Sequence, residues 1–388
     1  MTLVLIASDY RAANLRLQPW RFLSEIANGL RLLGHLVTVI SDVEAKFAPA
    51  GTVSVRSVRL PASGNPELEG HIQALEPDVC LWNFGLTSAW HFAPERLAWP
   101  SIALFTSPVY GPQDLLRLGM ARLWLARDHV LIHIVGAAVA HSRLRSALRP
   151  FRSVIVQSEA TLRALASRGV ASEQLHLIRP GVDDEFRIPL PEPATDEGPF
   201  VLGYMGSPLP IRGVLDLVDA VALVRAKGFD VRLSVLSRNS GQYARHERRL
   251  ERRIAKLGLR EVVTVRSGFM ARDELIDELT RVDLLALPFQ LVPSDAPLAV
   301  LEGMALGRPI LSTRVASITE YLTDGCGYLA DPGSPQTLAK AVAQAASDPM
   351  KRQCVRERAL AHASGFATWP DVAAQVAQIV NTHSEVPS

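Results

Sequence analysis

Short aliphatic and β-branched runs alternate along the chain with segments whose apolar residues recur every three or four positions. In the first half, strand-like runs lie at Leu3–Ser8, Leu36–Ser41 and Val79–Phe84, and a helical pattern occupies Phe22–Leu33. A run that is apolar on both faces is typical of a strand covered by helices on both sides of its sheet. The alternation therefore predicts parallel β-sheets flanked by helices.

The same alternation begins again after a proline-rich, acidic segment. Residues 187–199 read RIPLPEPATDEGP, a composition that disfavours both a helix and a central strand and is typical of a linker. Strand-like runs resume at Val201–Gly206. We predict an α/β protein of two doubly wound, Rossmann-like domains that face each other across a cleft and bind ligands beyond the carboxyl ends of their strands. The predicted units are residues 1–190, residues 191–365 and a C-terminal helix at 366–388 that packs back on the first domain.

Composition and charge exclude several classes of function. Of the 388 residues, 48% are hydrophobic and 21% are charged, and 41 basic against 39 acidic residues leave a formal charge of +2, so no overall positive field indicates nucleic-acid binding. The 3 cysteines are widely spaced and give neither a disulfide framework nor a metal-binding pair. No apolar run approaches the ~18 residues of a membrane-spanning helix, and the N-terminus lacks the pattern of a signal peptide. We therefore expect a cytoplasmic protein.

The segment Ser294–Gly307, SDAPLAVLEGMALG, has the pattern of a short apolar helix with one acidic residue. Ser294 or Asp295 would cap its N-terminus, and Glu302 is the one charged side chain within the helical stretch. An ionised carboxylate on an apolar face is costly unless a partner binds it. Two partners fit the pattern, namely a pair of ligand hydroxyls or an internal arginine.

The residues after the first strand of the second half have features of an anion site. In VLGYMGSPLPIRG, at positions 201–213, Gly206 ends the strand and permits a ligand to approach the backbone closely. Arg212 opens the next helix, where the helix dipole and free N–H groups favour a negative charge. The pattern predicts that Arg212 holds a diphosphate, although an arginine at a helix start is also common on solvated surfaces.

Five motifs in the second half occur in an order that resembles one family. They are IRPGVD at 178–183, GSPLPIRG at 206–213, DLLALP at 283–288, LAVLEGMALGRP at 298–309 and EYLTDGCGYL at 320–329. The ordered set is similar to the nucleotide-sugar domain of the GT-B fold retaining glycosyltransferases of family 4, the group 1 type, over roughly residues 150–345. The first half resembles that family only in its general layout.

The resemblance implies an enzyme that moves a sugar from a nucleotide diphosphate sugar to an acceptor with retention of the anomeric configuration. It implies that Glu302 binds the ribose, that Arg212 contacts the diphosphate and that Gly206 forms the turn before it. No aspartate cluster typical of a metal-bound donor stands in this half, so Arg212 and backbone N–H groups would stabilise the leaving group without a metal ion. The donor is a co-substrate, and no separate cofactor is expected.

The resemblance also implies contacts made by neighbouring segments. The loop at Ala296, Pro297 and Leu298 matches the backbone that faces the donor sugar and phosphate in the family. Phe269 and Leu287 match positions that border the nucleotide base.

Three departures from the family pattern keep alternatives open. Ser294 stands where the family carries the first glutamate of its pair, and Asp295 beside it is the candidate catalytic replacement. Ser207 takes the place of an arginine in the glycine turn, within the predicted donor site, and Pro108 takes the place of a histidine near the sugar. The alternatives are a nucleotide-sugar epimerase of the same fold and a relative that binds nucleotide without turnover.

Residues 117–152 contain seven arginines against one acidic residue, interleaved with leucine and tryptophan. Two interpretations remain: a basic amphipathic segment that binds anionic lipid at the inner face of the cell membrane, or a core helix with a solvated basic side. The expected acceptor is a sugar or glycan, or a lipid-linked molecule. The candidate acceptor contacts are Tyr10, Arg11, Thr106, Ser107 and Tyr110.

Overall fold

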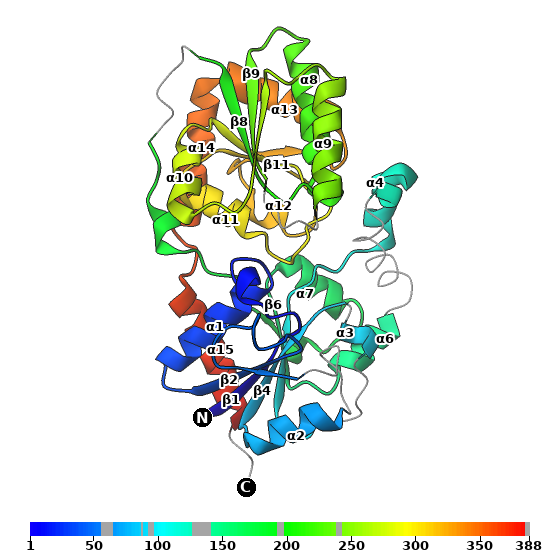
Figure 1. Cartoon of the computed structure of the whole chain (residues 1–388), viewed down its shortest axis with the longest axis vertical. Coiled ribbons are helices and arrows are strands. Elements are labelled where there is room, and N and C mark those ends of the chain that lie inside the picture. The colour runs from blue at the N-terminus through cyan, green and yellow to red at the C-terminus, as the bar shows by residue number, and fades with distance from the viewer. Residues whose placement is uncertain are drawn as a thin grey trace.

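The computed structural model describes residues 1–55, 65–86, 88–91, 97–125, 141–191, 198–237 and 243–384, and the structural statements below concern these residues. They form two α/β domains that follow one another along the long axis of the molecule (Figure 1). Each domain contains a parallel sheet covered by helices, so the predicted fold of two Rossmann-like domains is confirmed.

The N-terminal domain is built on a sheet of seven described strands, and every neighbouring pair in it is parallel. The strands are β1 Thr2–Ile6, β2 Leu36–Ser41, β3 Thr52–Ser54, β4 Val79–Phe84, β5 Ser101–Phe105, β6 Ser153–Val156 and β7 Leu175–Leu177, in the spatial order β3-β2-β1-β4-β5-β6-β7. The α-helices are α1 Trp20–Leu32, α2 Pro66–Ala74, α3 Ser88–His91, α4 Pro112–Leu125, α6 His141–Leu148 and α7 Glu159–Ala166. Short 3-10 helices are η1 Ala12–Asn14, η2 Ser172–Gln174 and η3 Asp184–Arg187.

The C-terminal domain repeats this plan with a sheet of six described strands, again all parallel. The strands are β8 Phe200–Gly206, β9 Val231–Ser237, β10 Val263–Ser267, β11 Leu284–Leu287, β12 Ile310–Thr313 and β13 Tyr328–Ala330, in the order β10-β9-β8-β11-β12-β13. The helices are η4 Pro210–Arg212, α8 Val214–Arg225, α9 Ala244–Lys256, α10 Arg272–Thr280, α11 Leu298–Ala305, α12 Ile318–Tyr321, α13 Pro335–Ser347 and α14 Pro349–Ala363.

The strand order reverses at an equivalent place in each domain. After β3 the chain returns to the free side of β1, and after β10 it returns to the free side of β8. In doubly wound sheets the ligand crevice lies at this reversal, outside the carboxyl ends of the strands. In the C-terminal domain the reversal lies between β8 and β11; Gly206 ends β8, Arg212 lies in the segment after it, and Glu302 lies on the helix that follows β11.

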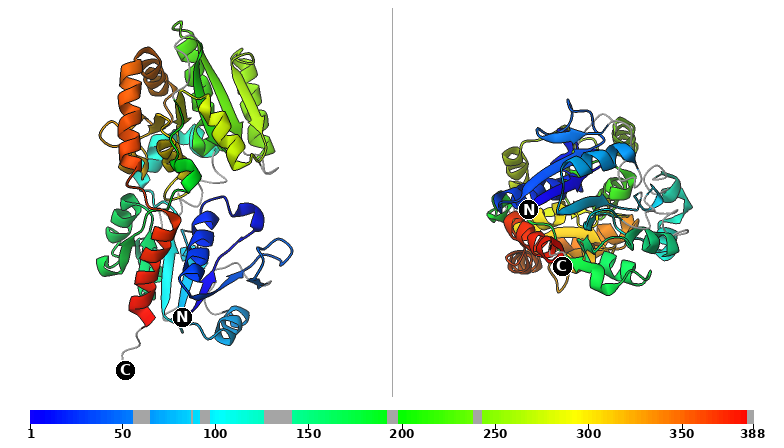
Figure 2. Two further views of the ribbon diagram at one scale, coloured as in Figure 1. Left: turned by 90° about the vertical axis from the view of Figure 1, so that its left-hand side faces the viewer. Right: turned by 90° about the horizontal axis from the view of Figure 1, so that it is seen from below.

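The C-terminal helix α15, Trp369–Ser384, returns to the N-terminal domain and packs along α1 (Figure 2). The rings of Phe22 and Trp369 meet edge to face with their centres 6.3 Å apart. At Gly29 a Cβ would lie 2.2 Å from the Cβ of Ala373, so the two helices approach this closely only because Gly29 has no side chain. The chain therefore passes between the domains once after η3 and again before α15.

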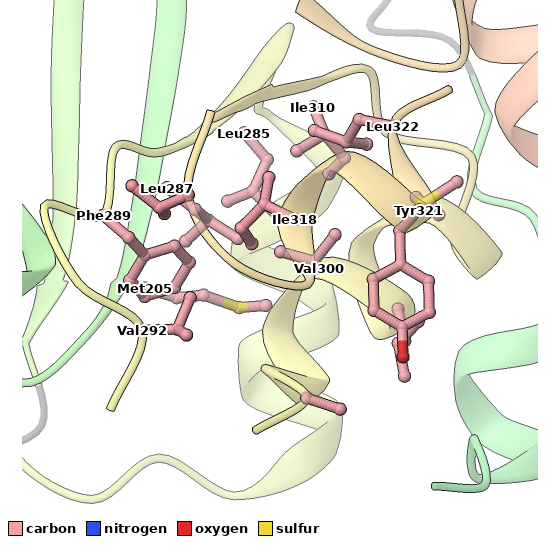
Figure 3. Close-up of a cluster of buried hydrophobic side chains, with 14 of the residues drawn as sticks. Met205, Leu285, Leu287, Phe289, Val292, Val300, Ile310, Ile318, Tyr321 and Leu322 are labelled. Atoms are coloured by element: carbon pink, nitrogen blue, oxygen red, sulfur yellow. The ribbon is translucent and has the colours of Figure 1, made fainter. Parts of the chain in front are cut away.

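An apolar cluster joins the two domains. Tyr110 and Leu118 of the N-terminal domain pack into a cluster that contains Met205, Phe289 and Val292 of the C-terminal domain. Figure 3 shows these last three side chains close together at one end of the cluster. The Tyr110 hydroxyl donates a hydrogen bond to the carbonyl oxygen of Val292 at 3.2 Å and accepts one from its N–H group at 2.7 Å. The domains are thus held together by core packing as well as by the two connections of the chain.

Candidate functional site

The two predicted donor stretches pack directly against each other beyond β8 and β11. The N–H groups of Gln290 and Leu291 both donate to the carbonyl oxygen of Ile211, at 2.7 and 3.1 Å. Gly213 adopts a φ of +74°, and a Cβ there would lie 1.8 Å from the carbonyl oxygen of Pro288, so only glycine fits this contact. The structure therefore brings both loops together at the crevice that the strand order predicts.

Arg212 ends η4 in the first of these loops and is half-buried. Its Nη1 fills the space beside Gly206, where a Cβ would lie 2.8 Å from that nitrogen, and its Cζ lies 5.8 Å from the centre of the Phe289 ring. Its Nε is buried without a hydrogen-bond partner, and no carboxylate in the described part of the chain forms an ion pair with this guanidinium. A buried donor without an acceptor is costly, so the position favours an anionic ligand.

Glu302 lies on α11, partly exposed, beside a charged network that joins both domains. Arg21 of α1 pairs with Asp183 at 2.5 Å, and Arg272 of α10 pairs with the same carboxylate at 3.0 Å. Each arginine also pairs with a second carboxylate, at 2.9 and 2.7 Å respectively. The Glu302 carboxylate itself has no hydrogen bond or ion pair with any described residue. The internal ion pair expected as one alternative is therefore not formed, and the ligand alternative stays a prediction.

The pKa of Glu302 is raised to about 7, first by burial and then by the Asp183 carboxylate, while Arg21 and Arg272 oppose the shift. The arginines oppose it only partly because their charge is already matched by the other carboxylates of the network. No pattern in the sequence predicts a role for Arg21 or Arg272. Of the three residues, Asp183 alone lies in one of the five ordered motifs, at the end of IRPGVD.

Asp295 and Ser294 are buried, with exposed fractions of 1% and 7%. The Asp295 carboxylate accepts hydrogen bonds from the N–H group of Gln157 and the hydroxyls of Ser158 and Thr161, at 2.8, 2.6 and 2.6 Å. The prediction that Ser294 or Asp295 caps its own helix is wrong, because α11 has no side-chain cap and Asp295 instead reaches the start of α7 in the other domain. Burial, as the largest cause, raises the pKa of Asp295 to about 6.

The remaining donor-side candidates differ in exposure. Phe269 is 57% exposed, and the guanidinium of Arg16 from the N-terminal domain lies 4.8 Å from the centre of its ring. Leu287 ends β11 inside the core, and Ser207 is buried with its carbonyl oxygen accepting a hydrogen bond from a tyrosine hydroxyl at 2.8 Å. Leu298 opens α11 and packs against the cores of both domains. No side chain caps α11, and in its first turn the Val300 N–H group donates to the carbonyl oxygen of Pro297 at 3.0 Å. The N–H groups of Leu298 and Ala299 are therefore the ones at this end of the helix that a ligand could use.

The acceptor-side candidates are mostly buried. Tyr10 lies in the N-terminal core, Thr106 binds an asparagine side chain through its hydroxyl, and Tyr110 is held by Val292. Arg11 is exposed and pairs with an aspartate at 2.5 Å, and Ser107 is half-buried. Of the five candidates, Arg11 and Ser107 are thus the ones with substantial exposed surface for an acceptor.

The arginine-rich segment 117–152 is described only in part, because residues 126–140 lie outside the described residues. In the described part, α4 buries Leu115 and Leu118 but exposes Leu116, Met120 and Trp124 at 75%, 82% and 69%. No helix in the described part of the chain has the length and apolar character needed to cross a bilayer.

Comparison with known sequences identifies the second half. Residues 199–348 match the family described as "Glycosyl transferases group 1". They form a group 1 glycosyltransferase domain. The resemblance predicted from the ordered motifs is therefore confirmed, and the paired loops with Gly206, Arg212 and Glu302 lie within this domain.

Several curated relatives of this group 1 glycosyltransferase domain are named D-inositol 3-phosphate glycosyltransferase. That of Corynebacterium urealyticum is 26% identical over 226 residues, which cover 55% of this chain and 52% of the relative. That of Stackebrandtia nassauensis is 30% identical over 210 residues, covering 50% and 45%. A lipopolysaccharide 1,2-N-acetylglucosaminetransferase of Salmonella typhimurium is 26% identical over 183 residues, covering 46% and 47%. The chain thus matches about half the length of these relatives.

Solved structures resemble the whole chain in fold. Sucrose-phosphate synthase from Thermosynechococcus elongatus superposes with a TM-score of 0.74 at 17% identity, covering 98% of each chain. HepE of Anabaena in complex with UDP superposes with a TM-score of 0.73 at 18% identity, covering 98% of this chain and 100% of HepE. The group 1 glycosyltransferase domain is therefore one of the two domains of a GT-B fold.

Proposed function

We propose that the protein transfers a sugar from a nucleotide diphosphate sugar to an acceptor, with retention of the anomeric configuration. The observation that carries this proposal is Arg212, a half-buried cation with an unused buried Nε, beside Gly206 and close to the loop that leads to the uncapped start of α11. Guanidinium and helix N-terminal N–H groups together favour a diphosphate, because both offer donors to phosphate oxygens. Glu302, unpaired on the same domain, would accept hydrogen bonds from the ribose hydroxyls.

In this mechanism the barrier lies in breaking the bond between the sugar and the leaving diphosphate. Negative charge grows on the diphosphate in the transition state, and donors fixed in place stabilise it without reorganising. In the described part of the chain, no three or more His, Cys, Asp or Glu side chains come together as a metal site. We assign the stabilisation to Arg212 and backbone N–H groups, with the leaving phosphate taking the acceptor's proton.

The similar proteins indicate a class of donor and a class of acceptor. The Anabaena structures hold UDP and UDP-glucose, and the curated relatives are named for transfer to an inositol phosphate and to lipopolysaccharide. We therefore propose a UDP-sugar donor and a sugar or polyol acceptor.

A transfer assay tests this function. We expect the full chain, with UDP-glucose or UDP-N-acetylglucosamine and a panel of inositol phosphates and glycans, to release UDP and form a product with the donor's anomeric configuration, read by NMR. Excess EDTA should leave the rate within about twofold of its value without chelator.

An epimerase would instead incorporate solvent deuterium into the donor sugar without an acceptor. A relative without activity would show a nucleotide-induced rise in Tm and no turnover.

We also propose that α4 docks on an anionic membrane surface. Three large apolar side chains of α4 are exposed, Arg117 on the same helix is exposed, and the exposed arginines 143, 145, 149 and 152 lie on α6 and just after it. Apolar side chains that enter the headgroup region beside arginines that bind lipid phosphates are typical of interfacial segments. In flotation with vesicles, binding should require phosphatidylglycerol and should fall at least about fivefold in Leu116→Ser/Met120→Ser. Equal flotation with neutral vesicles, or no loss in the variant, would contradict the proposal.

A further inference from the structure

The start of α7 is capped by two carboxylates of the other domain. Asp295 binds the N–H group of Gln157 and the hydroxyls of Ser158 and Thr161. Glu320 of α12 accepts hydrogen bonds from the N–H groups of Glu159 and Ala160, at 2.9 and 2.6 Å. The N–H groups at the beginning of this N-terminal-domain helix are therefore satisfied largely by side chains of the C-terminal domain.

This contact is strong for physical reasons. Carboxylates at a helix N-terminus gain from charge-assisted hydrogen bonds and from the helix dipole. Both side chains are buried, with exposed fractions of 1% for Asp295 and 8% for the Glu320 side chain, so water competes little for their oxygens. Arg179 of the N-terminal domain adds an ion pair to Glu320 at 3.6 Å. Separating the domains would expose both the carboxylates and the N–H groups of α7 at once.

The same residues are tied to the loop of residues 288–297 between β11 and α11, here named the donor loop. The N–H group of Asp295 donates to the carbonyl oxygen of Thr106 at 3.1 Å, and its own carbonyl oxygen accepts a hydrogen bond from the Ser317 hydroxyl at 2.6 Å. Ser317 directly precedes α12, which carries Glu320. Asp295 also lies three residues before the first residue of α11. The contact with α7 therefore constrains the backbone that leads into α11.

We propose that Asp295 and Glu320 are positioning residues that couple the packing of the two domains against each other to the conformation of the donor loop. This rests on the proposed function for its catalytic consequence, but not for the coupling itself. Asp295 then does not replace the family's sugar-binding glutamate. The carboxylate oxygens of Asp295 accept hydrogen bonds at the start of α7. Asp295 therefore acts on the donor through the backbone of the donor loop.

Hydrogen exchange of the full chain tests the coupling without substrate. In Asp295→Asn and in Glu320→Gln, amides at 157–161 should exchange at least about tenfold faster than in the unmodified protein, while those at 163–165 inside α7 keep their rates. Glu320→Gln should also accelerate exchange at 298–301 in the first half of α11, although Glu320 forms no hydrogen bond or ion pair with these residues. Asp331→Asn, in an exposed ion pair with Arg314, is the control and should change neither region.

Kinetics test the consequence for the reaction. In both variants the fraction of UDP-sugar hydrolysed rather than transferred should rise about tenfold, with the Kd for UDP within about threefold, because the loosened domains admit water. Unchanged exchange at 157–161 and 298–301 in both variants would overturn the coupling. A raised KM for the donor in Asp295→Asn alone, with unchanged exchange, would show that Asp295 contacts the donor sugar. If the unmodified protein transfers no sugar, the proposed function fails, while the exchange result still decides the coupling.

Discussion

Replacing Arg212 with alanine is expected to weaken the binding of UDP and UDP-sugars by about 30- to 100-fold, while the affinity for uridine changes by less than about twofold. The reason is that Arg212 has no carboxylate partner among the described residues and holds a buried Nε without an acceptor. A diphosphate would supply both the charge and the acceptor, whereas a nucleoside supplies neither. Isothermal titration calorimetry with UDP, UMP and uridine measures the difference directly.

Two variants control this experiment. Arg212→Lys keeps the charge but loses the planar pair of donors, so its affinity for UDP should lie between those of the original chain and Arg212→Ala. Arg225→Ala removes an arginine from the exposed ion pair with Asp230 at the end of α8 and should leave UDP binding unchanged. Equal losses for UDP and uridine in Arg212→Ala would refute the diphosphate contact.

Replacing Glu302 with glutamine is expected to stabilise the ligand-free protein and to weaken nucleotide binding. The pKa of Glu302 is raised to about 7 by burial and by Asp183, against the opposing effect of Arg21 and Arg272. The folded protein therefore holds the proton more tightly than the unfolded chain does. The stability that the protonated form contributes is fully present below pH ~4.5 and is lost as the pH rises towards 7. Glutamine is neutral at every pH and avoids this loss.

The expected gain in the free energy of unfolding is about 2 kcal/mol at pH 8, after allowance for partial exposure, and it should shrink towards zero at pH 5. Urea denaturation of both proteins across this range measures it. The pKa of Asp295 is also raised, to about 6, so ionisation of Asp295 also destabilises the fold as the pH rises. Both proteins contain Asp295, so this contribution cancels in the difference between their free energies of unfolding. The same variant should bind UDP about tenfold more weakly, because an amide accepts hydrogen bonds from ribose hydroxyls less well than a carboxylate does.

The control for this second prediction is Glu357→Gln on the exposed face of α14, which should change neither stability nor binding. A stability difference in Glu302→Gln that is the same at pH 5 and pH 8 would show that burial of the ionised carboxylate does not destabilise the fold. Unchanged affinity for UDP would remove Glu302 from the donor site.

The architecture could be predicted because its signals are local. Three patterns predicted two doubly wound domains: runs that are apolar on both faces, segments of helical spacing between them, and a proline-rich break. Each pattern is a property of residues that are neighbours in the sequence. The donor loops could be placed for a related reason. The strand order of such a sheet puts the residues after β8 and β11 at one crevice, so Ile211 and Gln290, which are distant in the sequence, meet through the topology of the sheet.

Side-chain partners could not be predicted in this way. An aspartate before a helix is a good cap for that helix, and this local rule failed for Asp295 because a competing set of donors came from α7. Its bond to Ser158 spans 137 positions of the chain, and the bond between Arg21 and Asp183 spans 162. Tyr110 was predicted to contact the acceptor, but its hydroxyl bonds to Val292 and its side chain is buried between the domains.

The amino-acid sequence by itself determined the fold class, the family and the fact that Glu302 is a lone acid on an apolar helix. Only the tertiary structure decided that Arg212 has no carboxylate partner and that Arg21 and Arg272, beside Glu302, are already paired with other carboxylates. It also decided that Asp295 and Glu320 bind the start of α7 in the other domain. This division follows from how far apart in the sequence the interacting residues are. Periodicity and motif order are set by residues close in the chain, whereas the partner of a charge depends on which distant segments the closed domains bring within hydrogen-bond distance.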